Sequence, residues 1–269
     1  MTKTINAAAN PALANQLATQ ATAEQPVEQE AKIINPTETT VTLPGGYLTL
    51  AGELVTEAEV KELTGKDEEA IARATTTGKA LLTILQRGTV TVGDEKVTEA
   101  ILDRLLSGDR DALLLGILKA TFGAECEVPS YCALCDEIKT VNVDLNTDIP
   151  VETLKDPIAD RVFVVEGKKN TFTVQLPTGI TQKELITNAD KTVAELNTIL
   201  LENTVIKIDN SPVLSKIQVQ NMGIVDRKNV IDEINKRMVG PKFDDLIVTC
   251  PDCESEVTVP INLGTLFRF

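Results

Sequence analysis

Two short cysteine pairs constrain this 269-residue chain more than any other feature of its sequence. Cys132 and Cys135 form one C-x-x-C pair, Cys250 and Cys253 form the other, and alternating β-branched residues follow each pair. Two thiolates at this spacing reach one metal ion from a tight turn, and two such turns complete a tetrahedral site. We therefore predict one structural Zn²⁺ held by all four cysteines, although 114 residues separate Cys135 from Cys250.

Other fates of these thiols remain open at this point. Free thiols or disulfides are alternatives, whereas a thioredoxin-like redox pair is disfavoured because neither motif opens a helix after a βαβ strand. The fifth cysteine, Cys126, either lies outside the site or replaces Cys132, and the matching spacing of the two pairs favours the first. A closed Cys₄ site has no open coordination position, so it would stabilise the fold and would not catalyse.

The absence of histidine narrows the possible chemistry. With no His in the chain, Ser-His-Asp triads, Cys-His pairs and His-ligated metals are excluded, and we expect no enzymatic activity. A net charge of −14 disfavours nucleic acid and anionic membranes as partners. No apolar run approaches the ~20 residues that span a bilayer, and the N-terminus lacks the apolar region of a signal peptide. We expect synthesis in a cytoplasm, where cysteines stay reduced.

The sequence also indicates an internal duplication. Thr89-Val-Thr-Val-Gly-Asp matches Thr204-Val-Ile-Lys-Ile-Asp, Gly108-Asp-Arg matches Val225-Asp-Arg, and the two cysteine pairs match each other. The offset drifts only from 115 to 118 along these matches, which fits single insertions in loops. We also pair Leu43-Pro-Gly-Gly with Leu176-Pro-Thr-Gly, Val97 with Val213, Gly123 with Gly240, and Val141, Val143 and Leu145 with Val259, Ile261 and Leu263.

These matches predict an α+β protein in which two related α/β repeats are joined by a split Cys₄ zinc ribbon. Residues 41–148 would form repeat 1 with the first zinc knuckle, and residues 149–269 would form repeat 2 with a hairpin and the second knuckle. Residues 1–40 are polar and of low complexity, and we interpret them as an extended N-terminal arm. The arm is either a tail or a segment that orders on a partner, with Leu13 and Leu17 one helical turn apart.

Several local patterns predict individual elements. Thr56 and Glu59 have the spacing of a capping box, which predicts a short helix that ends at Gly65. We expect Asp67 to cap the next helix, and a helix from 109 to 122 to end at Gly123. The two Asp-Arg pairs are interpreted as helix caps with local ion pairs, not as catalytic groups. Leu266, Phe267 and Phe269 either fold back into the core or anchor the chain in a neighbouring subunit.

A resemblance to a known family rests on five ordered stretches. These are Leu43-Pro-Gly-Gly, the run Glu53-Leu-Val-Thr-Glu-Ala-Glu-Val-Lys-Glu-Leu-Thr-Gly-Lys-Asp-Glu-Glu, Gly108-Asp-Arg-Asp-Ala-Leu-Leu-Leu-Gly-Ile, a knuckle with Val-Asp-Leu, and a last knuckle before a Phe-rich end. Over residues 41–269 the chain resembles the baseplate hub subunits and hub assembly proteins of T-even-type phages.

The resemblance implies a non-enzymatic component of a phage tail baseplate or hub, located in the virion, that binds other tail proteins. It leaves open an assembly factor that is absent from the finished particle, and a homo-oligomer within a symmetric tail. A zinc-ribbon protein-binding module of a regulatory complex is a further alternative. That class predicts a basic stripe near the knuckles, whereas the residues there are acidic: Asp136, Glu137, Asp252, Glu254 and Glu256.

Overall fold

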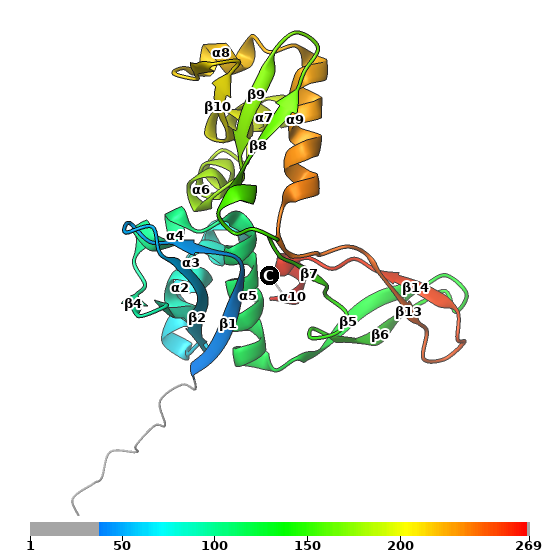
Figure 1. Ribbon diagram of the computed structural model, residues 1–269. Coiled ribbons are helices and arrows are strands. Elements are labelled where there is room, and N and C mark those ends of the chain that lie inside the picture. Colours follow the sequence, from blue (N-terminus) through cyan, green and yellow to red (C-terminus); the bar gives the residue numbers. More distant parts are fainter. Residues whose placement is uncertain (1–37, 268–269) are drawn as a thin grey trace, which may run out of the picture. The chain divides into compact units, whose positions relative to one another are not determined.

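The computed structural model describes residues 38–267, and most of the N-terminal arm predicted over 1–40 lies outside this range (Figure 1). The first strand begins at Glu38, a few residues before the predicted boundary. We call residues 38–148 the N-terminal half. Its elements are β1 (Glu38–Leu48), β2 (Leu54–Lys61), α2 (Gly65–Ile71), α3 (Thr77–Gly88), β3 (Thr89–Val92), β4 (Glu95–Lys96), α4 (Glu99–Arg104), α5 (Ser107–Phe122), β5 (Glu125–Cys132) and β6 (Glu137–Asp144).

The helix predicted after Thr56 is wrong, because this segment is strand β2. Ala58 and Val60 are buried at alternate positions, and the strand pairs antiparallel with both β1 and β3. A period of two places alternate side chains on one face, and burial of that face outweighs the helix propensity of the glutamates and Ala58. The capping box lies further along, where Asp67 Oδ2 accepts a hydrogen bond from Thr64 N at 2.9 Å. Thr64, not Asp67, is therefore the N-cap of the next helix.

Helix α5 occupies the centre of the N-terminal half. Its middle turns are buried on all sides, with Leu113 and Ile117 fully covered, and it contacts β1, β2 and α3. A helix that is apolar all round is expected to be an internal one. The predicted end at Gly123 is confirmed, since this glycine has a φ of 90°, a conformation that favours residues without a Cβ.

The C-terminal half comprises residues 149–267. It contains the predicted hairpin, and Thr192 and Glu195 have the spacing of a capping box, in which Thr192 Oγ1 accepts a hydrogen bond from the N–H of Glu195. The elements are β7 (Val151–Glu152), η2 (Ala159–Arg161), β8 (Val162–Glu166), β9 (Thr171–Gln175), α6 (Gly179–Thr187), α7 (Val193–Thr204), β10 (Val205–Ile208), β11 (Ser211–Pro212), α8 (Lys216–Gln220), α9 (Ile224–Arg237), β12 (Gly240–Pro241), β13 (Leu246–Thr249), β14 (Glu256–Val259) and α10 (Leu263–Leu266).

The two halves share one order of elements. Each has a strand pair, two helices, a second strand pair, two helices and a hairpin that carries a cysteine pair. Each forms a four-stranded sheet in chain order, β1-β2-β3-β4 and β8-β9-β10-β11. The same turn closes both second strand pairs, because Val97 N donates to Val90 O at 3.0 Å and Val213 N donates to Ile206 O at 3.0 Å.

One of the sequence matches is wrong. Leu43-Pro-Gly-Gly lies inside strand β1, whereas Leu176-Pro-Thr-Gly precedes helix α6 and supplies its N-cap, Thr178. The residue that stands in the place of Thr178 in the N-terminal half is Thr64, the N-cap of α2. The two Leu-Pro-x-Gly stretches are therefore not equivalent positions of the two halves. Similar residues occur here in a strand with a bulge and at the start of a helix.

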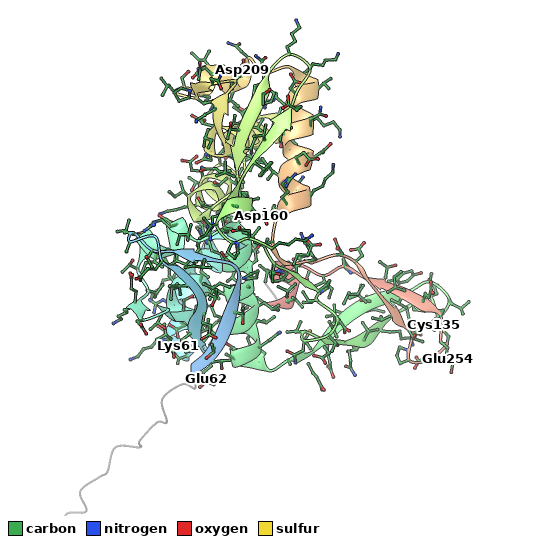
Figure 2. All side chains as sticks on the ribbon, in the orientation of Figure 1. Lys61, Glu62, Cys135, Asp160, Asp209 and Glu254 are labelled. Atoms are coloured by element: carbon green, nitrogen blue, oxygen red, sulfur yellow. The ribbon has the colours of Figure 1, made fainter. Side chains whose placement is uncertain are left out.

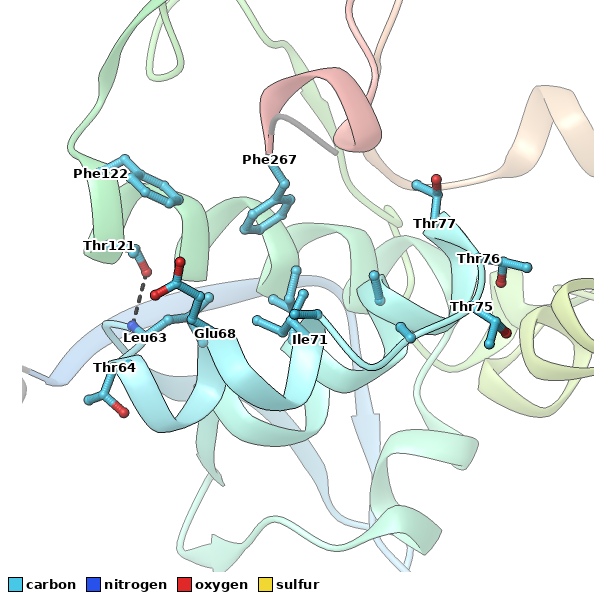
Figure 3. Close-up of a pocket in the computed structure, with 15 residues that line it drawn as sticks. Leu63, Thr64, Glu68, Ile71, Thr75, Thr76, Thr77, Thr121, Phe122 and Phe267 are labelled. Atoms are coloured by element: carbon cyan, nitrogen blue, oxygen red, sulfur yellow. Dashed lines mark hydrogen bonds between the residues drawn. The ribbon is translucent and has the colours of Figure 1, made fainter.

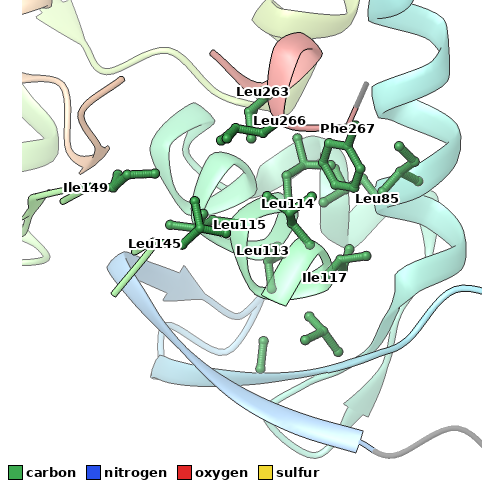
Figure 4. Packing of buried hydrophobic residues seen from close by; sticks show 14 of the residues in the cluster. Leu85, Leu113, Leu114, Leu115, Ile117, Leu145, Ile149, Leu263, Leu266 and Phe267 are labelled. Carbon is green, nitrogen blue, oxygen red and sulfur yellow. The ribbon is translucent and has the colours of Figure 1, made fainter. Parts of the chain in front are cut away.

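Two hydrophobic cores are built partly from each other's half. The end of the chain returns to the N-terminal half, where Leu266 and Phe267 are buried against α5 and α3 (Figure 4). In the other direction, Leu106 packs in the core of the C-terminal half. The expectation that the C-terminal apolar residues fold back is confirmed for Leu266 and Phe267, and Phe269 lies outside the described residues. Between 38 and 267, no helix is long and apolar enough to cross a membrane.

Candidate metal centre

The candidate metal centre is formed by the turns of two antiparallel hairpins. Strands β5 and β6 pair in register from Glu125 to Cys132, and β13 and β14 pair from Leu246 to Thr249. Each cysteine pair lies where its first strand ends and the chain turns back. Strand β14 packs against β5, which brings the two turns together although they belong to different halves of the chain.

Each turn closes on a residue in the left-handed region. Asp136 follows Cys135 with a φ of 56°, and Glu254 follows Cys253 with a φ of 59°. In the second turn, Glu254 N donates to Cys250 O at 3.1 Å and Cys250 N donates to Ser255 O at 2.8 Å. In both turns, a residue with a left-handed backbone thus follows directly after the second cysteine. Figure 2 shows Cys135 and Glu254 close together at the end of the hairpins.

The four sulfur atoms form a compact cluster. Cys132 Sγ lies 3.5 Å from Cys253 Sγ, and Cys135 Sγ lies 3.9 Å from Cys250 Sγ. All four sulfurs lie within 4.8 Å of one another. A tetrahedral zinc ion with Zn–S bonds of ~2.3 Å separates its sulfurs by roughly 3.8 Å. The cluster therefore has the dimensions of a Cys₄ zinc site, and its contacts are far too long for disulfide bonds of ~2.05 Å.

Ser255 adjusts the acidity of the cluster, and sequence reasoning did not identify it. Its hydroxyl lies 3.3 Å from Cys132 Sγ and 3.1 Å from Cys253 Sγ. Hydrogen bonds from this hydroxyl and from the Cys135 backbone N–H lower the pKa of Cys132 to about 6. The same hydroxyl lowers the pKa of Cys253, while contact with Cys253 raises the pKa of Cys135 to about 12. Hydrogen bonds that favour the charged forms of Cys132 and Cys253 suit the cluster to a divalent cation, because a metal binds thiolates and releases their protons.

The surroundings of the cluster are apolar beneath and acidic outside. Cys132 and Cys250 are buried with Val257, while Cys135 and Cys253 are partly exposed. Lys139 links the two hairpins, because its Nζ lies 2.6 Å from the carboxylate of Glu137 and 2.6 Å from that of Asp252. Both contacts raise the pKa of Lys139, and the contact with Asp252 contributes more than the contact with Glu137. The five acidic residues noted in the sequence are all exposed: Asp136, Glu137, Asp252, Glu254 and Glu256.

Cys126 lies at the other end of strand β5. It pairs in register with Val143, whereas Cys132 pairs with Glu137 at the turn. Its side chain is half-buried against the core of the N-terminal half. Six residue steps along the strand from Cys126 to Cys132 correspond to about 20 Å. Cys126 therefore does not belong to the sulfur cluster, as the spacing of the two pairs predicts.

The two Asp-Arg pairs lie in the first turns of α5 and α9, but the prediction that they cap these helices is wrong. The N-caps are Leu106 and Gly223, and the two carboxylates reach beyond their own helices. Asp109 Oδ1 accepts a hydrogen bond from Gly45 N at 2.6 Å, and Asp226 Oδ1 accepts one from Lys168 N at 2.8 Å. Burial raises the pKa of Asp109 to about 6, although Gly45 N–H and the guanidinium of Arg161 favour its charged form. Arg161 itself donates to Gly45 O at 2.8 Å. This buried group ties strand β1 to the chain that enters the C-terminal half, so it has a structural explanation.

The comparison with protein families gives one match. A family described as T4 bacteriophage base plate protein matches residues 37–267, which include both halves and both cysteine turns. No curated protein and no solved structure matches the chain. The match covers most of the sequence, and the chain belongs to the T4 bacteriophage base plate protein family.

Proposed function

We propose that this chain is a permanent structural subunit of the phage baseplate, at its hub, and that a structural Zn²⁺ holds its two halves together. Cys132, Cys135, Cys250 and Cys253 are the proposed ligands. The observation that supports this proposal most strongly is the sulfur cluster, because it joins turns that lie 115 positions apart in the chain. Such a cross-link would stabilise a structural subunit, because the free energy of metal binding adds to the free energy of folding.

A closed set of four thiolates favours a scaffold over an enzyme. With four protein ligands, zinc offers no position for substrate or water. Asp109, the carboxylate whose pKa is raised by burial, is fully buried and accepts a hydrogen bond from the backbone of β1. We propose on these grounds that the protein works by binding other tail proteins and not by catalysis.

We also propose that the two halves are copies of one ancestral unit. The common order of elements, the equal strand order of the two sheets and the matching helix starts support this. Thr64 and Thr178 begin α2 and α6, and Thr76 and Thr192 begin α3 and α7. The sulfur cluster would then be an interface between equivalent hairpins, each of which supplies half of the ligands.

The end of the ribbon has the character of a protein-binding surface. Tyr131 and Ile138 face each other in register on the outer side of the first hairpin, and they are 57% and 72% exposed. Leu134 in the adjacent turn is also exposed. Exposed apolar side chains that cluster in this way mark interaction sites more often than chance exposure does. The acidic residues around them favour a protein partner over nucleic acid.

Counting copies in particles tests the proposed role. Peptide mass spectrometry on gradient-purified phage should find a few copies per particle relative to a major tail protein. A chain that is abundant in infected-cell lysate but absent from particles would instead be an assembly factor. Absence from both would contradict a role in the tail.

A further inference from the structure

Helix α6 of the C-terminal half is docked on three helices of the N-terminal half. Gly179, its first residue, is buried and donates its N–H to Leu105 O at 2.9 Å. A Cβ atom there would collide with Leu102 O and with the guanidinium of Arg110. The docking therefore requires glycine at the first position of α6.

Two polar side chains of α6 complete this contact. Gln182, the fourth residue of the helix, donates from Nε2 to Asp111 Oδ1 at 3.1 Å. Lys183, the fifth, forms ion pairs with Glu99 and Asp103 of α4. The face of the N-terminal half that receives α6 is therefore acidic, and α6 brings a lysine to it.

Within residues 38–267, the corresponding face of the C-terminal half is exposed and carries lysines at the positions of two of the acidic partners of α6. Lys216 is the first residue of α8, as Glu99 is of α4, and Lys228 is the fifth of α9, as Asp111 is of α5. Both lysines are exposed, and Lys228 also forms an ion pair with Asp232 one turn along its own helix. Two large apolar residues at helix starts are also exposed on this face, Val193 by 74% and Ile224 by 87%.

Helix α2 corresponds to α6, and its matching surface is also uncovered. Gly65 is its first residue, in the place of Gly179, yet a Cβ atom at Gly65 would meet nothing within 4 Å. Among residues 38–267, therefore, nothing requires a glycine at that position. Glu68 and Glu69, both exposed, occupy the places of Gln182 and Lys183. The uncovered helix thus carries negative charge, and the uncovered face carries positive charge.

We propose that copies of this chain associate head to tail, with α2 of one copy docked on the α7, α8 and α9 face of the next. The contact repeats between chains the packing of α6 within the chain, so it rests on the proposed duplication. Glu69 of one copy then lies near Lys216 of the next copy, and Glu68 lies near Lys228. Gly65 takes the role of Gly179, which explains a glycine that no contact in the described part of one chain requires.

The groove beside α2 fits the apolar part of this contact. It has a volume of about 750 Å³ and is lined by Glu68, Ile71, Phe122 and Phe267 among others (Figure 3). Phe122, at the end of α5, is 64% exposed. The residue in the matching position of the C-terminal half, Val239 after α9, is buried. An apolar residue such as Ile224 of the next copy would cover it.

Side-chain volumes show where the contact between chains differs from its template. Gly108 approaches the backbone of Val239 so closely that a Cβ could not fit, and Val225 stands in the place of Gly108. The chains must lie further apart at this point than the halves do. Within the chain, Ile186 after the middle of α6 packs on Gly78 of α3. In the contact between chains, Ala72 takes the place of Ile186 and Ala194 of the next copy takes the place of Gly78. Such a head-to-tail contact joins two different surfaces, so it continues into a ring or a filament and does not stop at a dimer.

Cross-linking identifies the contact directly. Zinc-supplied full-length protein labelled with ¹⁵N is mixed with an equal amount of ¹⁴N protein, and carboxylates are joined to amines with a carbodiimide. We expect mixed-isotope peptides that link the segment of Glu68 and Glu69 to the segments of Lys216 or Lys228. Cross-links found only within one isotope, or none at these segments, overturn the proposal.

Charge reversal provides the second test. Glu69→Lys and Lys216→Glu should each raise the concentration for half-association at least tenfold in sedimentation velocity, and the double variant should return it to within threefold. Gly65→Leu should also weaken association while leaving the thermal unfolding midpoint of the monomer unchanged or higher. Glu53→Lys and Lys155→Glu are control reversals outside both surfaces. A chain that stays monomeric at millimolar concentration overturns the proposal, and particle counting can still succeed in that case.

Discussion

The sulfur atoms of Cys132 and Cys253 lie 3.5 Å apart, although 121 positions separate these residues in the sequence. The contact joins the last residue of strand β5 to a turn between β13 and β14, and hence joins the two halves of the chain. Further connections between the halves are the C-terminal helix α10 in the N-terminal core, Asp109 beside Arg161, and helix α6 packed on α3, α4 and α5. Four predictions test these connections.

Removal of the metal should loosen the hairpins and leave the helical parts intact. With a strong chelator, we expect backbone amides of β5, β6, β13 and β14 to exchange hydrogen at least ten times faster, because zinc binding contributes to folding only where its ligands lie. Exchange in α5 should change little, since its side chains are buried independently of the cluster. Hydrogen exchange with mass spectrometry measures both. Uniform acceleration along the chain, or no change in the hairpins, would be inconsistent with a local zinc staple.

Replacement of Glu254 by glycine should stabilise the protein. Glu254 has a φ of 59°, a conformation that costs a residue with a Cβ roughly 1 kcal/mol relative to glycine. We expect Glu254→Gly to raise the free energy of unfolding by about that amount in urea titrations of the zinc-loaded protein. Glu256→Gly is the matched control in strand β14, where glycine should destabilise instead. Asp136→Gly should gain less, because Asp136 also accepts a hydrogen bond from the Tyr131 hydroxyl at 2.5 Å.

The buried carboxylate of Asp109 should make stability depend on pH. Its pKa is raised from 3.8 to about 6 by burial, so the folded protein holds this proton more tightly than the unfolded chain. The contribution of Asp109 is therefore most favourable below about pH 4, falls as pH rises from about 4 to 6, and is constant above that range. Relative to Asp109→Asn, which keeps an oxygen for Gly45 N–H, the natural protein should lose up to about 3 kcal/mol across this interval. A difference between the two proteins that does not change from pH 4 to 7 would show that Asp109 titrates normally.

The C-terminal helix should contribute strongly to the N-terminal core. Leu266 is 6% exposed and packs with α5 and α3, so Leu266→Ala should cost about 2–5 kcal/mol of unfolding free energy. Leu50→Ala is the control, since Leu50 is 92% exposed in the turn between β1 and β2 and should change stability by less than about 0.5 kcal/mol. Equal effects of the two substitutions in thermal or urea unfolding would mean that α10 does not close the core.

The parts of this fold that the sequence predicts best are those with a strict local code. The C-x-x-C pairs bring all four sulfurs together, and Thr192 with Glu195 caps a helix as its spacing predicts. The local pattern predicts a helix after Thr56, but residues 54–61 form strand β2. Pairing with β1 and β3 and the burial of Val60 outweigh the helix propensity of this segment.

The remaining features depend on contacts between distant residues. Nothing near Ser255 in the sequence indicates that its hydroxyl lies against a sulfur atom from the other half of the chain. The pairing of Lys139 with Asp252 likewise exists only because the two hairpins pack together. Asp109 looks like an ordinary residue in the first turn of a helix, and only the approach of Gly45 and Arg161 makes it a buried link between the halves. Such groups are identified by packing and not by local pattern.

The zinc content of the full-length protein tests the central claim most directly. The chain is purified without chelator, and its metal-to-protein ratio is measured by inductively coupled plasma mass spectrometry, with Cys126→Ser and Cys250→Ser proteins in parallel. The account predicts one zinc per chain in the natural protein and in Cys126→Ser, and a large loss in Cys250→Ser. A folded natural protein that contains no zinc, or a Cys250→Ser protein that binds it as well, would contradict the account.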